Sequence, residues 1–163
     1  MSGGMSDDRT DGRAALGEAM LARARASEAQ EFGSFFLSRL LGFEVSYPDD
    51  RCVVRFEAVA PLFNPQGTLH GGILATAMDV SMGHLLHRAA GAGATLEMKV
   101  QYLAAVTSGL VRCEGRFLRR GRAICFLQSQ AFDAGDRLVA HATATWMVRT
   151  APAEGRKDPP SAA

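Results

Sequence analysis

The sequence predicts an α+β domain in which a curved, mostly antiparallel sheet packs around one long buried helix. Between residues 73 and 89, apolar side chains lie nearly all round the predicted helix, and a helix with so little polar face is a buried one. Residues 95–148 instead form long runs of strand-type residues separated by short turns, which indicates antiparallel strands. Because the sequence offers only one such helix, the sheet has to curl around it.

Two helices and a hairpin are expected ahead of the buried helix. Residues 14–29 consist largely of Ala, Leu, Arg and Glu, which are good helix formers. Residues 27–41 carry Phe and Leu at helical spacing, and Gly42 is placed to end that helix. The next two segments are strand-like and flank a Pro-Asp-Asp turn, so they should pair as a hairpin: residues 43–47 and 52–57.

The long runs after the buried helix should form an antiparallel meander, because short turns join them. Residues 95–103 alternate between apolar and polar side chains, as a half-buried strand does. Turns are expected at residues 119–122 and 133–136, where Gly stands among charged residues. The remaining strands are predicted at residues 110–118, 123–132 and 138–148.

One folded domain, residues 13–149, is the simplest organisation for a chain of 163 residues. Residues 1–12 are rich in Gly, Ser and Asp and are expected to form a mobile tail. Residues 150–163, with Pro, Lys and Gly, are expected to form a second one.

Composition and charge argue against several classes of function. The formal net charge is +1, so no basic face for nucleic acid is expected. No apolar run reaches the roughly 20 residues that span a bilayer, and nothing near the N-terminus resembles a secretion signal. Cys52, Cys113 and Cys125 lie in strand-like apolar runs without a CxxC pair, which favours buried thiols in a reducing compartment. We therefore expect a cytoplasmic protein that binds neither nucleic acid nor membrane.

The segment that leads into the buried helix carries the main signal for function. It reads Asn64-Pro65-Gln66-Gly67-Thr68-Leu69-His70-Gly71-Gly72 and predicts a polar turn that opens the helix. The first N–H groups of a helix have no partner within the helix, and the helix dipole favours an anion there. A Gly at this point lets a ligand approach the backbone closely. The segment therefore indicates a site that polarises a carbonyl oxygen.

Asp79, inside the apolar helix, is the candidate for acid–base or nucleophilic chemistry. A carboxylate among Met78, Val80 and Met82 is costly to bury unless it is paired or functional. Burial would raise its pKa towards that of a useful base. The alternative is a structural role, in which Asp79 caps or pairs with a neighbouring group. The segment upstream favours the functional interpretation.

This order of elements resembles the hotdog-fold thioesterases, in particular the PaaI-like group of acyl-CoA thioesterases of phenylacetate degradation. The resemblance covers roughly residues 30–149 and implies a hotdog fold with an extra N-terminal helix. It also implies hydrolysis of acyl-CoA thioesters without metal or prosthetic group. The group forms homodimers joined sheet edge to sheet edge, often paired into homotetramers, with active sites at the dimer interface. The matching residues are Asn64, Gly67, Leu69, His70, Gly71, Gly72, Asp79 and the strand 95–103.

The resemblance also assigns roles to individual residues. The Gly71 N–H would polarise the thioester carbonyl, with help from the Asn64 side chain. Asp79 would be the general base or the nucleophile, and the Thr95 hydroxyl would help to hold the attacking water, although Thr is also common in strands. His70 would orient the turn by hydrogen bonding, as part of the catalytic set or as a purely structural residue. Substrate contacts are expected from Gly72, Met82, Arg119, Arg120 and Arg122, the three arginines either binding the CoA phosphates or forming an exposed basic turn.

Helix geometry adds a constraint on how Gly71 and Asp79 can act together. The two residues are eight positions apart, or ~12 Å along a helix. Reacting atoms must meet within about 3–3.5 Å. If both groups act, Asp79 should therefore serve a site whose Gly71 belongs to a neighbouring chain.

Three other interpretations stay open at this point. His84 and His87 stand three residues apart on the helix, but a metal site would need a further ligand, and the sequence offers no clear one. A hotdog dehydratase or hydratase would pair a His with an acid, whereas His70 lies far along the helix from Asp79. A non-catalytic acyl-CoA sensor is the third, and the presence of Asp79 argues against it. We expect no metal and no cofactor beyond the coenzyme A of the substrate.

Overall fold

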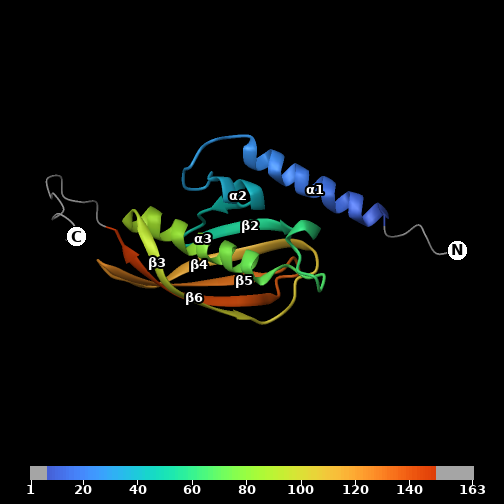
Figure 1. Cartoon of the computed structure of the whole chain (residues 1–163). Helices are drawn as coiled ribbons and strands as arrows, with labels where there is room; N and C mark the ends of the chain where they lie inside the picture. Colours follow the sequence, from blue (N-terminus) through green and yellow to red (C-terminus); the bar gives the residue numbers. More distant parts are fainter. Residues whose placement is uncertain (1–6, 150–163) are drawn as a thin grey trace, which may run out of the picture.

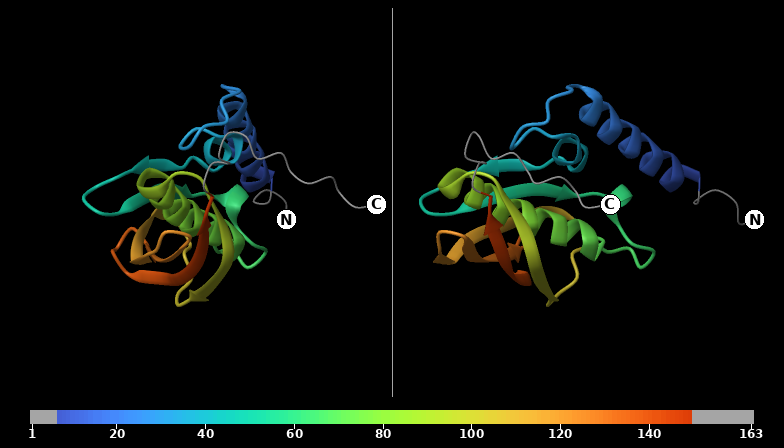
Figure 2. Two further views of the ribbon diagram at one scale, coloured as in Figure 1. Left: turned by 90° about the vertical axis from the view of Figure 1, so that its left-hand side faces the viewer. Right: turned by 60° about the vertical axis from the view of Figure 1, so that its left-hand side comes forward.

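The computed structural model describes residues 7–149 and confirms the predicted α+β class (Figure 1). Within these residues, a six-stranded antiparallel sheet curves around the long helix α3 (Gly71–Ala90), as Figure 2 shows end-on. The strands are β1 (Glu44–Ser46), β2 (Cys52–Ala58), β3 (Gly93–Tyr102), β4 (Gly109–Arg120), β5 (Ile124–Phe132) and β6 (Leu138–Val148). The other helical segments are α1 (Asp7–Arg25), α2 (Phe36–Leu41) and the short 3-10 helix η1 (Ala60–Leu62).

The position of β3 is where the topology differs from the predicted meander. The strand order is β1-β2-β4-β5-β6-β3. The β1–β2 hairpin and the β4–β5–β6 meander are confirmed. β3, however, pairs with β6 and not with β4. The reason is that α3 crosses the hollow of the sheet and delivers the chain to the far side, so that β3 becomes an edge strand (Figure 1).

Apolar packing and one close backbone approach hold α3 against the sheet. A Cβ atom on Gly115 of β4 would lie 2.6 Å from the carbonyl oxygen of Ser81, so a Gly is required where the helix crosses this strand. Beside this contact, Ser81 Oγ and Ser129 Oγ lie 2.9 Å apart and satisfy each other in the buried interior. The fully buried core around them includes Val54, Phe56, Met78, Met82, Leu86, Val111 and Leu127.

The bounds of the two N-terminal helices differ from the predicted ones. α1 begins at Asp7, inside the segment expected to be a tail, and ends at Arg25. The helix predicted over residues 27–41 is reduced to α2, and residues 26–35 form a loop. Gly33 has a φ of +89°, in the left-handed region that no helix continues through.

The Arg39 side chain explains how the loop 26–35 is stable without helical hydrogen bonds. Its guanidinium donates to the backbone carbonyls of Ala24, Ser27, Ala29 and Ser34. Carbonyl groups that a helix would have satisfied internally are thus satisfied by one side chain. The loop is thereby fixed in a single path beside α3.

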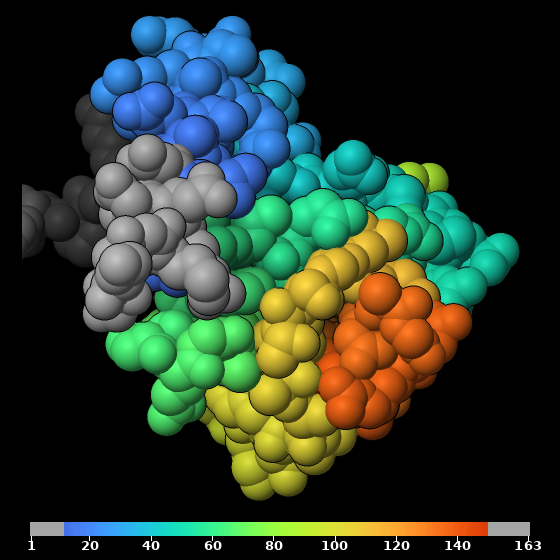
Figure 3. All heavy atoms as spheres, turned by 90° about the vertical axis from the view of Figure 1, so that its right-hand side faces the viewer, coloured from blue at the N-terminus to red at the C-terminus, as the bar shows by residue number. Residues whose placement is uncertain are grey.

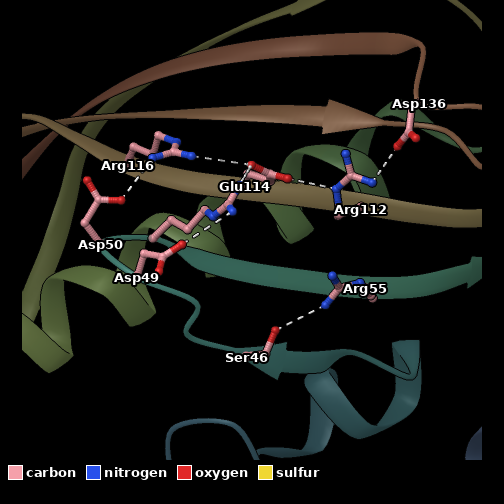
Figure 4. A network of polar contacts seen from close by, with 9 residues as sticks. Ser46, Asp49, Asp50, Arg55, Arg112, Glu114, Arg116 and Asp136 are labelled. Atoms are coloured by element: carbon pink, nitrogen blue, oxygen red, sulfur yellow. Dashed lines mark hydrogen bonds and ion pairs between the residues drawn. The ribbon is translucent and has the colours of Figure 1, made fainter.

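Outside the core, an ion-pair network joins the strands near the β1–β2 hairpin (Figure 4). Glu114 of β4 is bonded at 2.8 Å by both Arg51 and Arg112. Arg116 reaches Asp50, and Arg112 reaches Asp136. This network fastens the hairpin and the β5–β6 turn to β4. None of its members lines the cavity described below, so we assign it to stability.

The loop before α3 (green) lies beside the β3–β4 connection (gold), which in turn lies beside the β5–β6 turn (orange), as Figure 3 shows. The Leu69 N–H donates to Val106 of the β3–β4 connection, and the His70 N–H donates to the Leu62 carbonyl. Arg137 in the β5–β6 turn reaches the Ala105 carbonyl. These bonds fix the start of α3.

Within the described chain, none of the helices is long and apolar enough to cross a membrane.

Candidate active site

Asp79 lies in the wall of a mostly apolar cavity beside α3. The cavity has a volume of about 490 Å³. The middle of α3 forms one side of it, the start of β3 and Trp146 of β6 form another, and the loop 26–35 covers the rest. Phe32 and Phe35 of that loop and Val80 and Ala94 make the lining mostly apolar. A carboxylate therefore faces a space suited to an apolar acyl group.

One hydrogen bond and partial burial define the state of the Asp79 carboxylate. The Thr95 hydroxyl donates to Asp79 Oδ1 at 3.0 Å. Burial raises the pKa of Asp79 above its ordinary value, and the Thr95 hydrogen bond partly opposes this by stabilising the charged form. The resulting group is a carboxylate of increased basicity held in a fixed position, which is what a general base requires. Thr95 was predicted to help hold an attacking water, which stays a prediction; in the structure its hydroxyl is bonded to Asp79.

Replacing Asp79 with Asn should make the protein more stable at neutral pH. Because the folded-state pKa is raised, the charged form opposes folding above that pKa, and this opposition disappears below the unfolded-state value near 3.8. Asp79→Asn keeps an oxygen acceptor for Thr95 and removes the charge. We expect Tm to rise by about 2–4 °C at pH 7, the shift that a gain of about 1 kcal/mol produces in a chain of this size.

Thermal unfolding at one protein concentration and two pH values measures this effect. The difference between Asp79→Asn and the parent should shrink as the pH is lowered towards 4, where the parent carboxyl becomes protonated. A drop in Tm for the variant at pH 7 would instead mean that the Asp79 charge has a stabilising partner.

The N-terminus of α3 carries the second half of the predicted site. His70 is the N-cap residue, with φ −63° and ψ 129°, and its Nδ1 accepts the Gly72 N–H at 2.9 Å. The prediction that His70 orients this turn is therefore matched by its geometry. The Gly72 N–H is occupied by that bond. Among the described residues, the Gly71 N–H has no acceptor, so it is the donor open to a ligand.

Asn64 has a structural task in this turn. Its Oδ1 accepts from the N–H groups of Gln66 and Thr68, and its Nδ2 donates to Thr68 Oγ1 at 2.9 Å. The amide therefore holds the turn that places Gly71. Its direct action on a substrate carbonyl stays a prediction, which would use the Nδ2 proton not engaged by Thr68.

Gly71 and Asp79 face different hollows of the same chain. Gly71 lines a second cavity of about 380 Å³, together with Asn64, Leu74 and Tyr102. The Tyr102 hydroxyl donates to the Gly71 carbonyl at 2.8 Å. Gly71 is not part of the wall of the Asp79 cavity. Within one chain, the two halves of the predicted site are therefore separate.

The predicted substrate contacts are distributed over more than one region. Met82 is fully buried in the core and does not line the Asp79 cavity. Arg119 and Arg120 belong to the end of β4, so that the turn begins only at Gly121. Arg119, Arg120 and Arg122 are exposed, and Arg120 donates to the Ala89 carbonyl near the end of α3. Their contact with CoA phosphates stays a prediction.

Several residues of the cavity were not identified as site residues from the sequence. Phe32 and Phe35 carried the pattern of a helix, and their place in a covering loop depends on Arg39. Trp146 enters the wall because β6 pairs with β3, placing Trp146 opposite Thr95. His84 was considered only as a metal ligand. Its spacing of five residues from Asp79 is not that of one helix face, so helical periodicity gave no signal that the two line one cavity.

A long central helix wrapped by a curved antiparallel sheet, with a glycine-rich helix entrance and an acid within the helix, defines a hotdog-fold protein. A family profile described as the thioesterase superfamily matches residues 66–145. The conserved protein PA5202 of Pseudomonas aeruginosa is 36% identical, with 68% of this chain and 91% of that chain covered and a TM-score of 0.64. The chain belongs to the thioesterase superfamily, as the helix entrance predicted.

Two further relatives carry names that refer to activity. A Ralstonia eutropha JMP134 protein named "putative thioesterase, phenylacetic acid degradation-related protein" is 27% identical, with 79% of this chain and 99% of that chain covered and a TM-score of 0.66. A Saccharolobus solfataricus protein named "Putative esterase SSO2140" is 32% identical over 84 residues, which is 50% of this chain. The matched segment spans 60% of that esterase.

Proposed function

We propose that this protein hydrolyses acyl-CoA thioesters to a free acid and coenzyme A, with Asp79 as the catalytic carboxylate. The observation that carries the proposal is the partly buried Asp79, held by Thr95 at the wall of a mostly apolar cavity. A cavity of about 490 Å³ suits an aryl or medium-chain acyl group. The names of the relatives, which refer to esterases and thioesterases, support the same reaction class.

The reaction needs a base at the attacking water and a donor at the carbonyl oxygen. Asp79 takes a proton from water as the water oxygen forms a bond to the thioester carbonyl carbon. The oxyanion accepts a hydrogen bond from the Gly71 N–H at the positive end of α3. The C–S bond then breaks, and the proton held by Asp79 passes to the CoA sulfur. In the covalent alternative, the Asp79 carboxylate attacks the carbonyl carbon and the C–S bond breaks, releasing CoA thiolate, which takes a proton from solvent. Water then hydrolyses the resulting anhydride to the free acid and the Asp79 carboxylate.

The structure supports a site shared between two chains, because β3 links the two separate halves. Near its start, Thr95 binds Asp79, and at its end, Tyr102 binds the Gly71 carbonyl. β3 is a long edge strand, and Leu96, Tyr102 and Leu103 on or beside it are exposed. Such an edge is a template for pairing with another chain. In a two-fold dimer, β3 would pair antiparallel with its copy, which places the Thr95 end of one strand beside the Tyr102 end of the other.

This arrangement predicts that two inactive variants restore each other. One chain carries Asp79→Asn and the other Gly71→Pro, a change that removes the backbone donor and displaces the exposed Tyr102 ring. In a mixed dimer, one site combines the intact Gly71 of the first chain with the intact Asp79 of the second. We expect about half of the wild-type activity per purified mixed dimer, since one of two sites is complete.

Differently tagged chains, co-expressed and purified through both tags, provide the mixed dimer for a thiol-release assay. Each variant alone, prepared in the same way, is the control. A mixed dimer as inactive as its parents would show that Asp79 and Gly71 serve the same chain. If the dimers pair into a homotetramer, the expected activity falls below one half, because a tetramer of two parental dimers carries both tags but has no complete site.

The direct test of the proposed function is CoA release from a panel of aryl and straight-chain acyl-CoA thioesters. Wild-type turnover of at least one class, absent from Asp79→Asn, is the expected result. Tight binding of acyl-CoA without turnover would favour a sensor. Hydration of an enoyl-CoA without CoA release would favour a hydratase.

A further inference from the structure

A buried imidazole in the acyl cavity has no task in the chemistry described above. His84 is only 2% exposed and lines the same cavity as Asp79. Its Nδ1 lies 2.9 Å from the Tyr47 hydroxyl. Its Nε2 is buried and has no hydrogen-bond partner among the described residues. Trp146, in another part of the same wall, likewise has a buried Nε1 without a partner.

The protonation of His84 follows from its surroundings. Burial, and to a smaller degree the neighbouring His87, lowers the pKa of His84, so the ring is neutral. Burial raises the pKa of Tyr47, so the phenol is also neutral. A phenol hydroxyl is a good donor and Nδ1 is its acceptor here. We assign the proton of the neutral imidazole to Nε2, which is then an N–H donor without an acceptor.

A donor of this kind is unfavourable in a cavity wall unless a ligand uses it. Burying an N–H without an acceptor forfeits its hydrogen bond to water, and an apolar side chain would fill the same place without that loss. Gln30, Glu31, Asp79 and Thr95 also line the cavity and carry acceptor oxygens, but none of them accepts a hydrogen bond from His84 Nε2. The Phe32 ring lies edge-on to the imidazole, with centroids 5.1 Å apart, and covers it. Phe32 also stacks on His87, with ring centroids 3.6 Å apart, but it is 54% exposed, so its side chain can rotate away from His84 while the loop backbone keeps its path.

We propose that the His84 Nε2–H receives an oxygen atom on the distal part of the acyl group. This inference rests on the proposed thioesterase function and defines its substrate class as acyl-CoA thioesters oxygenated away from the carbonyl. His84 follows Asp79 by five residues, or ~7.5 Å along the helix. An extended acyl chain covers such a length in about six bonds. The five-residue step also turns His84 by about 140° around the helix, so the axial rise is the minimum separation. A hydroxyl at the third carbon falls short of this minimum, and one at the sixth carbon is long enough to span it.

The experiment compares kcat/KM for hexanoyl-CoA, 6-hydroxyhexanoyl-CoA and 3-hydroxyhexanoyl-CoA. Wild type should prefer the 6-hydroxy substrate over hexanoyl-CoA by about 10-fold or more, because only that oxygen satisfies the buried donor. The kcat/KM for 3-hydroxyhexanoyl-CoA should equal that for hexanoyl-CoA. In His84→Leu, the preference should disappear, with kcat/KM for hexanoyl-CoA unchanged or increased. His84→Gln keeps an N–H donor near the same place, so this variant should retain part of the preference for 6-hydroxyhexanoyl-CoA.

Hydrolysis of hexanoyl-CoA by each variant shows that the variant is folded and catalytically intact. Equal kcat/KM for all three substrates in wild type would overturn the receptor role and leave the thioesterase function standing. An equal loss for hexanoyl-CoA and 6-hydroxyhexanoyl-CoA in both His84 variants would overturn it too, since a packing role would have that effect. Absence of CoA release from every thioester in wild type would overturn the proposed function and this inference together.

Discussion

Asp79→Asn is expected to lower kcat for thioester hydrolysis by about 10³-fold, within the range that a positioned general base contributes. The amide keeps an acceptor for Thr95 and nearly the same shape but cannot take a proton from water. KM should change little, because the cavity walls are untouched. The measurement is CoA release under saturating substrate, with thermal unfolding to show that the variant is folded. Turnover close to that of wild type would assign Asp79 a structural role.

The pH dependence identifies the ionising group. In wild type the carboxylate is the active form, so activity is lost as the pH falls through the Asp79 pKa, which burial places above the ordinary value of 3.8. Thr95→Val removes the hydrogen bond that lowers this pKa. The acidic limb of the kcat/KM profile should therefore move to higher pH in Thr95→Val. A limb that stays in place would belong to another group.

Gly71→Pro is expected to reduce kcat by about 10²–10³-fold, the usual cost of losing one donor to an oxyanion. Gly71 is the first residue of α3, and Pro is well accepted at the first helical position because that N–H has no helical partner. The residue before a Pro must be extended, and His70 with ψ 129° already is. The substitution thus removes the N–H while the helix start is kept.

Gly71→Ala is the matched control for this variant. A Cβ atom at position 71 would lie 3.1 Å from the Tyr102 ring, so both substitutions make Tyr102 shift. The Tyr102 side chain is 54% exposed and can give way. Because Gly71→Ala keeps the N–H, it should retain most of the wild-type kcat. Equal losses in the two variants would mean that crowding at Tyr102, and not the missing donor, causes the effect.

Local patterns in the sequence were sufficient to predict the central helix and its entrance. The apolar residues of 73–89 surround the helix, and the structure places that helix at Gly71–Ala90. The turn before it was predicted from its Asn and Gly residues, and its hydrogen bonds are made within the segment or to adjacent loops. Both features depend on residues close together in the chain, which is why periodicity and composition are informative about them.

Local sequence patterns could not predict the loop 26–35 or the position of β3 in the sheet. The Phe residues of the loop have helical spacing, but Arg39 binds its carbonyls and Gly33 leaves the helical region. The alternation of apolar and polar side chains predicts that residues 95–103 form a strand. It does not indicate with which other strand this one pairs. Pairing with β6 is decided by where α3 delivers the chain.

The glycine-rich helix entrance and the acid within the helix could both be recognised from the sequence alone, as could the ~12 Å that separates Gly71 from Asp79 along α3. Only the tertiary structure decided what surrounds each of them. The apolar cavity at Asp79 combines a loop, a helix and two strands, and its wall includes His84 and Trp146, with Tyr47 bonded to His84 behind it. The physical reason is that such walls form from contacts between segments far apart in the chain, which no local pattern encodes.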